Sequence, residues 1–159
     1  NLMLFYTGIM RTAEKVAKSY VEDIQKKSEQ LLLMQDMVDD AIEILKKGEL
    51  DEFGYLLNET WQKKRSLSRI VSNERVDKIY SMALSAGALG GKLSGAGGGG
   101  FLLFYVPIEK QSNVKNKLSK LLHVPFKFES SGSQIIFYDQ DKEYKDENKN
   151  RPFINIKEL

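Results

Sequence analysis

The chain contains no cysteine, which excludes disulfide bonds, thiolate metal sites and catalysis by a thiol. It also has a single histidine, His123, and one imidazole cannot build a histidine cluster around a metal. Asp36, Asp39 and Asp40 are close in the sequence, but their spacing along a helix does not assemble a metal site. We therefore expect no metal-binding residues in this chain.

Long apolar runs and an excess of one charge are also missing. No apolar run reaches the length of a membrane span and no secretory signal is visible, so a cytoplasmic location without a membrane partner is expected. The 24 basic and 22 acidic residues are interleaved, which leaves no basic stripe for nucleic acid. With 159 residues, 42% of them apolar, the chain is long enough for one domain with its own core.

The most informative segment is rich in glycine. Residues 95–100 hold five glycines in six positions and lead directly into an apolar run over 101–106. Glycine packs no side chain, so a cluster beside a strand indicates that the backbone approaches something closely. A phosphate is one candidate, because successive N–H groups can converge on an anion. A flexible hairpin turn is the alternative.

Two known phosphate-binding motifs do not explain this segment. Gly95, Gly97 and Gly100 have the spacing of the dinucleotide fingerprint, which requires a strand before it and a helix after it. Here a strand follows the glycines. A P-loop lysine is followed by Ser or Thr at the start of a helix, whereas Lys92 is followed by leucine.

Hydrophobic periodicity predicts a mixed fold. Strands are predicted at 2–6, 88–94, 101–106, 125–129 and 134–138, and helices at 12–24, 31–45, 51–71, 73–87 and 109–122. Gly48 after two lysines is a typical helix end, and Asn73 is a typical N-cap. The order predicts an α+β class: a ferredoxin-like antiparallel sheet with helices packed on one face. It is a split βαβ whose first crossover has grown to several helices.

The two ends of the chain carry separate predictions. The chain starts at Asn1 without methionine and enters a strand at once, so we expect a longer protein whose N-terminal half is missing here. Residues 139–159 are mostly charged, which predicts a mobile tail, although 152–156 could dock. The predicted organisation is therefore a domain over 1–138 and a tail over 139–159.

Residues 92–101, which read Lys-Leu-Ser-Gly-Ala-Gly-Gly-Gly-Gly-Phe, resemble the third signature motif of the GHMP kinases. These small-molecule kinases are named for galactose, homoserine, mevalonate and phosphomevalonate. Residues 6–11 and 61–68 are similar to the sugar-kinase branch that phosphorylates D-glycero-D-manno-heptose 7-phosphate at the anomeric position, with fucose kinases as relatives. The resemblance covers residues 2 to about 138.

The resemblance implies that this chain is the C-terminal domain of such a kinase. ATP, Mg²⁺ and the catalytic residue would be held mainly by the missing N-terminal domain, so this chain alone would be inactive and would form half of a cleft. The glycine-rich loop would lie against the ATP phosphate loop of the missing half and shape the cleft near the transferred group. The cofactor-binding residues implied are Ser94, Gly95, Ala96, Gly97, Gly98, Gly99 and Gly100. A structural hinge is the alternative, and Ser94 could merely close the turn.

Three candidate substrate-binding residues, Thr7, Gly8 and Arg11, follow the predicted strand at residues 2–6. Arg11 stands where a strand passes into a helix, a position unfavourable for a cation unless it binds an anion. Its guanidinium could grip the 7-phosphate of an acceptor sugar, with Thr7 and Gly8 forming the cleft wall. A solvated arginine is the alternative.

Lys92 could balance phosphate charge or simply be an exposed lysine.

Trp61 and Lys64 are three residues apart and share a helix face. The indole could stack on a sugar and the lysine could hold a phosphate or hydroxyl. The alternative for Trp61 is the core, beside Phe53 and Leu57. Arg65 and Arg69 are interpreted as surface charges, the segment from Met34 to Met37 as core filling, and His123 as a cation at a helix end or on the surface.

These residues predict the C-terminal half of an ATP-dependent sugar kinase acting on heptose 7-phosphate. The family implies that its product feeds polysaccharide biosynthesis. Expected partners are the sugar phosphate and the N-terminal domain, and a homodimer is an open alternative. Alternatives are a fucose, galactose or mevalonate kinase, a ligand-sensing ferredoxin-like domain, and an interaction module, which would show a large exposed apolar patch.

Overall fold

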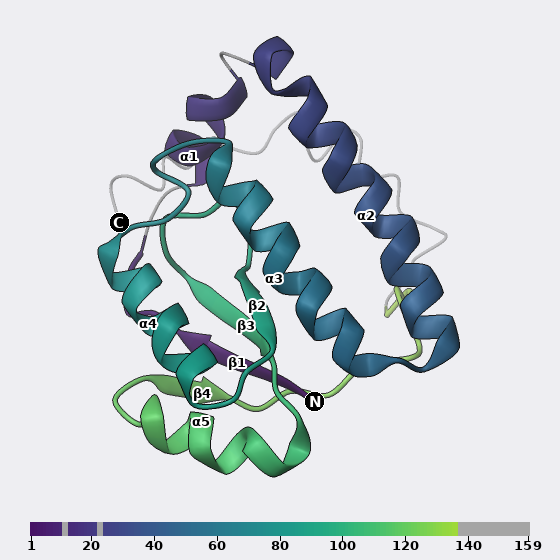
Figure 1. The fold of residues 1–159 in the computed structure, drawn as a ribbon, viewed down its shortest axis with the longest axis vertical. Helices are drawn as coiled ribbons and strands as arrows, with labels where there is room; N and C mark the ends of the chain where they lie inside the picture. Colours follow the sequence, from purple (N-terminus) through teal and green to yellow (C-terminus); the bar gives the residue numbers. More distant parts are fainter. Residues whose placement is uncertain (11–12, 22–23, 137–159) are drawn as a thin grey trace, which may run out of the picture. The chain divides into compact units, whose positions relative to one another are not determined.

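A computed structural model describes residues 1–10, 13–21 and 24–136 of the chain. The chain forms two compact units, Asn1–Phe126 and Lys127–Leu159. The described elements of the first unit are, in order, β1 (Leu2–Tyr6), α1 (Ala13–Val21), η1 (Ile24–Lys27), α2 (Ser28–Lys47), α3 (Leu50–Ser66), α4 (Glu74–Ser85), β2 (Gly90–Leu93), β3 (Phe101–Tyr105), η2 (Ile108–Lys110), α5 (Gln111–Lys117) and β4 (Leu122–Val124) (Figure 1).

Within the described residues, the four strands form one antiparallel sheet in the order β2-β3-β1-β4. In its register, Leu4 of β1 lies between Leu103 of β3 and Val124 of β4. The connection from β1 to β2 contains α1 to α4, and the connection from β3 to β4 contains α5. This topology confirms the predicted ferredoxin-like α+β class with an enlarged first crossover.

The core lies on one face of this sheet. Met3 and Phe5 alternate with half-buried residues along β1, and Leu102 and Phe104 are buried on either side of the half-buried Leu103 in β3. Helices α4 and α5 contribute Val76, Ile79, Tyr80, Ala83 and Val114 to the same cluster. The Tyr80 and Phe104 rings lie 5.6 Å apart. Burial of this apolar surface holds the helices against the sheet, at about 25 cal/mol per Å².

Helix α3 lies along β2, the edge strand of the sheet, and so protects its unpaired backbone. Gly54 of α3 and Gly90 of β2 allow this approach, because a Cβ on Gly90 would lie 1.9 Å from the Gly54 carbonyl oxygen. Beside this contact, the hydroxyl of Tyr105, which pairs with Gly90 in the sheet, donates to Asp51 Oδ1 of α3 (3.0 Å).

Two predicted helix ends in the first crossover, the end of α2 and the start of α4, agree with the structure. Helix α2 ends at Gly48, whose φ of 77° is the left-handed conformation expected of a glycine C-cap. The Asn73 side chain accepts a hydrogen bond from the Val76 amide and caps α4 (3.1 Å). Both sequence signals are confirmed. No helix in the described ranges has the length and apolar character needed to cross a membrane.

Predictions after α5 are partly wrong. The predicted helix 109–122 is split into η2 and α5, and the last strand among the described residues is Leu122–Val124 rather than 125–129. Pro125 has no N–H for the ladder, and Phe128 is 85% exposed, so the alternating aromatics do not mark a buried strand face. Residues 134–136 form no strand either. Residues 137–138 and the predicted tail 139–159 lie outside the described residues.

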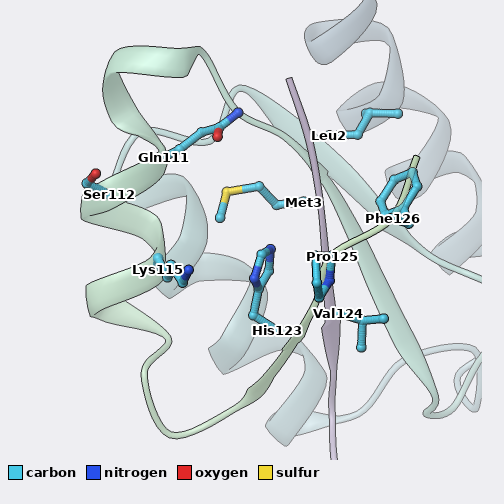
Figure 2. Close-up of a pocket in the computed structure, with 9 residues that line it drawn as sticks. All are labelled: Leu2, Met3, Gln111, Ser112, Lys115, His123, Val124, Pro125 and Phe126. Carbon is cyan, nitrogen blue, oxygen red and sulfur yellow. The ribbon is translucent and has the colours of Figure 1, made fainter. Parts of the chain in front are cut away.

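His123 therefore lies in β4 and not at a helix end. Its ring packs 5.1 Å from the Phe5 ring, beside a hollow of about 350 Å³ between α5 and the strands (Figure 2). Lys115 and Ser112 line the hollow from α5, and Met3 lines it from β1. Burial lowers the pKa of His123, and the nearby charge of Lys115 lowers it further.

We expect NMR titration to give a pKa for His123 below the ordinary value of 6.5. The single imidazole makes the assignment unambiguous. Because the folded-state pKa is lowered, the unfolded state binds more protons below about pH 6.5, and stability falls as the pH drops through this range. His123→Gln should remove this part of the pH dependence. Lys115→Met should move the pKa upward; an unchanged value would contradict the assigned charge effect.

Candidate functional site

Three loops meet at the end of β1. They are the β1–α1 loop (residues 7–10), the α3–α4 loop (residues 67–73) and the glycine-rich loop between β2 and β3 (residues 94–100). The Gly98 amide donates to the Val71 carbonyl (2.8 Å), and the Gly100 amide donates to the Ile9 carbonyl (2.9 Å). The Asn73 side chain donates to the Gly98 carbonyl (2.9 Å). The glycine-rich loop is therefore held by both neighbouring loops.

Close backbone packing explains two of the glycines. At Gly97, which has a φ of 121°, a Cβ would lie 2.8 Å from the Val71 carbonyl oxygen. At Gly99 it would lie 2.7 Å from the Ile9 carbonyl oxygen. The sequence predicted that the backbone approaches something closely. At Gly97 and Gly99, it approaches other loops of the same chain.

Other positions of the loop face outward. Ser94 and Gly95 are exposed, and a Cβ on Gly95 or Gly100 would meet no atom within 4 Å. No described residue accepts a hydrogen bond from the amides of Gly95 and Ala96. The Ser94 amide donates to the Phe101 carbonyl (2.8 Å) and closes the turn. Amides without an acceptor among the described residues leave the loop able to bind an anion.

Lys64 and Lys92 lie beside this outward part. The Lys64 ammonium, on α3, donates a hydrogen bond to the Gly95 carbonyl. Lys92 is half-buried in β2 and leads into the loop. Burial lowers the pKa of Lys64, and the positive charge of Lys92 lowers it further. Two cations held close enough to perturb each other are electrostatically costly, and a bound anion would relieve that cost.

A further cation, the guanidinium of Arg75, lies beside Gly8 in the β1–α1 loop. Gly8 has a φ of 74°, and a Cβ placed on it would lie 3.0 Å from a guanidinium nitrogen of Arg75. Arg75 is exposed in the first turn of α4, where the helix dipole does not favour a cation. The sequence analysis missed Arg75, although the argument applied to Arg11 would have singled it out. Arg11 itself lies outside the described residues.

Two candidate residues are fully buried. Trp61 is 0% exposed and its ring packs 6.2 Å from the Tyr80 ring, so its expected role in stacking on a sugar is corrected to one in the core. Thr7 is also fully buried, and its hydroxyl donates to the Gly100 carbonyl (2.8 Å). Thr7 therefore anchors the glycine-rich loop to β1 instead of forming an exposed cleft wall.

Arg65, which lies near the loops, has a structural partner. Arg65 forms an ion pair with Asp77 (2.9 Å), and Asp77 also accepts a hydrogen bond from the Ser72 hydroxyl (2.6 Å). These contacts agree with a surface role for Arg65. Arg69 is exposed at the same turn.

The acidic residues Asp36, Asp39 and Asp40 are exposed on α2. Within the described ranges, no group of three His, Asp or Glu side chains could hold a metal.

The fold and the loop together define a class: a ferredoxin-like α+β domain that presents a glycine-rich hairpin loop, supported by two neighbouring loops and flanked by lysines. Residues 22–124 match the family model described as "GHMP kinases C terminal". The chain belongs to this family, as the resemblance of residues 92–101 implied.

Curated relatives of the chain are kinases of small molecules. It is 33% identical over 121 residues to D-glycero-alpha-D-manno-heptose 7-phosphate kinase of Campylobacter jejuni, covering 74% of this chain and 35% of that protein. It is also 33% identical over 117 residues to L-fucokinase/L-fucose-1-P guanylyltransferase of Bacteroides fragilis, covering 71% of this chain and 12% of that protein. The chain thus spans a minor part of each relative.

A solved structure supports the fold assignment. Mevalonate kinase of L. major, determined in complex with R-mevalonate, superposes with a TM-score of 0.65 at 28% identity. The match covers 75% of this chain and 37% of that protein. The relatives extend well beyond the region that the chain matches.

Proposed function

We propose that this chain is the C-terminal half of an ATP-dependent sugar kinase that phosphorylates D-glycero-D-manno-heptose 7-phosphate at its anomeric hydroxyl. The observation that carries the proposal is the outward part of the glycine-rich loop, where the amides of Gly95 and Ala96, which have no acceptor among the described residues, lie beside Lys64 and Lys92. The similarity to a heptose 7-phosphate kinase supports the choice of acceptor. The domain would extend over 1–138 and act in the cytoplasm with an N-terminal domain.

The residues fit a nucleotide phosphate, because unpaired backbone amides and ammonium groups are its usual ligands. ATP would supply the phosphoryl group, and Mg²⁺ would neutralise its charge. We assign no residue of this chain to Mg²⁺, which we place mainly with the N-terminal domain. Gly95 and Ala96 would face the phosphates, and Lys64 and Lys92 would balance charge at the cleft. Such positioning and charge stabilisation are the main sources of catalysis in phosphoryl transfer.

The phosphate of the acceptor would bind at a second position. The guanidinium of Arg75 lies over Gly8, in the loop that continues to Arg11. Arginine recognises phosphate through two parallel hydrogen bonds, so these two residues would distinguish a phosphorylated sugar from a free one. A fucose kinase is the second candidate, supported by the similarity to L-fucokinase, and its acceptor would carry no phosphate.

The test is an assay of ATP consumption by the full-length protein with heptose 7-phosphate, unphosphorylated heptose and L-fucose. Activity should require the phosphorylated sugar. Arg75→Ala and Arg11→Ala should raise KM for that sugar roughly tenfold or more, because each removes a charge-assisted contact. Preference for L-fucose would favour the fucose kinase, and an unchanged KM in both variants would reject the phosphate clamp.

The lysine pair gives a separate prediction. Lys64→Met and Lys92→Met should each lower kcat/KM about 10- to 100-fold, because each removes a positive charge from the proposed phosphate site. Lys63→Met is the matched control: Lys63 neighbours Lys64 on α3 but lines a hollow between α2 and α3. Its kinetics should remain near those of the wild type. Equal losses in all three variants would show that the pair has no special role.

A further inference from the structure

The hollow between α5, β1 and β4 takes no part in the proposed reaction. Its volume is about 350 Å³, which is enough for a small ligand. The hollow lies beside Met3, near the start of β1, whereas the glycine-rich loop is anchored to Thr7, just after the end of that strand. At 3.3 Å per residue these two positions are roughly 13 Å apart, so the hollow is separate from the proposed phosphate site.

The elements around the hollow carry cations but no acidic residue. β1, α5 and β4 contain neither Asp nor Glu. Residues 110–128 hold five lysines and the single histidine, and the nearest acidic residues in the sequence are Glu109 and Glu129. Cations gathered without acidic neighbours produce a positive potential, which attracts anions. The surroundings of the hollow therefore favour a negatively charged ligand.

Two polar side chains in the hollow, Lys115 and His123, have no partner for their N–H groups. Figure 2 shows Lys115 reaching from α5 toward the imidazole of His123 on β4. Neither side chain makes a hydrogen bond or an ion pair with another described residue. Ser112 adds a hydroxyl from α5. Gln111 also lines the hollow, but its amide nitrogen already donates to the Val106 carbonyl (3.3 Å).

The rest of the lining is apolar. It consists of Leu2, Met3, Val124, Pro125 and Phe126. Met3 is deeply buried, and its flexible thioether can adapt to a ring placed against it. An inorganic anion would leave these side chains in contact with water, whereas a ligand with an apolar body would cover them.

We propose that this hollow is a second anion site, which binds a small phosphate monoester with an apolar or ring-bearing body. Lys115, Ser112 and His123 donate to the phosphate, whose three free oxygens match the three donors. A carboxylate offers only two oxygens to the same groups. The body of the ligand packs on Met3 and Phe126. Binding here involves no chemical step and does not depend on the proposed kinase reaction.

The first test uses phenyl phosphate and the 159-residue chain, in which the imidazole NMR signals come from one residue. Saturable shifts of these signals are expected at pH 7, with a dissociation constant of about 1 mM or lower for so small a probe. Saturation should raise the pKa of His123, because the phosphate offsets the positive charge of Lys115. Imidazole signals that do not respond, or a pKa that stays unchanged at saturation, would overturn the proposal.

Two further probes test the two halves of the ligand. Phenol lacks the charge and inorganic phosphate lacks the ring, so each should bind roughly fivefold or more weakly than phenyl phosphate. Phenol binding as tightly as phenyl phosphate would reject the anion site. Inorganic phosphate binding as tightly would reject the role of the apolar lining.

Substitutions locate the binding. Lys115→Met should weaken phenyl phosphate about tenfold, because it removes a charge-assisted hydrogen bond. Lys117→Met is the matched control, since Lys117 is exposed on the same helix but does not line the hollow. Equal losses in the two variants would show only a diffuse attraction to basic residues and would contradict a site.

A last variant separates this proposal from the proposed function. Lys64→Met changes the proposed nucleotide phosphate site and should leave the response of His123 to phenyl phosphate as it is in the wild type. A response abolished by Lys64→Met would place the probe at the glycine-rich loop and overturn the second site. Because none of these readouts involves kinase activity, either proposal can fail while the other stands.

Discussion

Gly90→Ala is expected to destabilise the domain by about 3 kcal/mol or more, the largest stability effect predicted here. The new Cβ would lie 1.9 Å from the Gly54 carbonyl oxygen and 2.8 Å from the Asn58 amide nitrogen. Both obstacles are backbone atoms of α3, so no side-chain rotation relieves the clash. The helix would have to move away from β2, which would also disturb Trp61 in the core.

Urea denaturation followed by circular dichroism measures this loss. Gly48→Ala is the control, because Gly48 has a φ of 77° and a Cβ there would meet no atom within 4 Å. Its cost should be only the left-handed backbone strain, about 1 kcal/mol. If the two variants lost similar stability, close packing of α3 on β2 would not be the reason for glycine at position 90.

Local signals in the sequence were sufficient for much of the fold. β1 has the predicted bounds because its five apolar residues match a strand with one deeply buried face. Helix α2 ends at Gly48 and α4 begins after Asn73, since both ends depend on interactions within a few residues. Given this order of strands and helices, few sheet topologies were possible.

Long-range packing decided the features that the sequence did not predict. Leu122 and His123 were assigned to a helix and its end, yet they pair with β1 as an edge strand. Whether these residues form a helix or a strand depends on the unoccupied edge of β1, which no local sequence pattern indicates. Trp61 shows the same limit for the site: helical spacing placed it near Lys64, but only packing against Tyr80 shows that its ring is buried.

The glycine-rich loop combines both kinds of information. The sequence indicated close backbone approach but could not say to what. In the structure, Gly97 and Gly99 approach Val71 and Ile9, whereas Gly95 faces outward beside Lys64. The buried glycines thus hold the loop in position, and the outward part remains available for the proposed phosphate contact. Rigid support of this kind is needed if backbone amides are to stabilise a transferred phosphoryl group.

This division of roles predicts that Gly99→Ala lowers kcat/KM of the proposed full-length kinase about 100-fold, the largest effect on activity expected here. An added Cβ would lie 2.7 Å from the Ile9 carbonyl oxygen, which also accepts a hydrogen bond from the Gly100 amide. Because Gly99 does not have a left-handed φ, the substitution acts through this contact and not through backbone strain. The glycine-rich loop must shift, and a displacement of about 1 Å can cost two orders of magnitude in rate.

Gly100→Ala separates loop displacement from strain, because Gly100 has a φ of 91° but open space around its Cβ position. It should cost about 1 kcal/mol of stability and less than tenfold in kcat/KM. Steady-state kinetics and thermal unfolding of both variants provide the comparison. Activity near the wild-type level in Gly99→Ala, with the fold intact, would show that the position of this loop does not control phosphoryl transfer. A larger kinetic loss in Gly100→Ala would instead assign the effect to backbone strain.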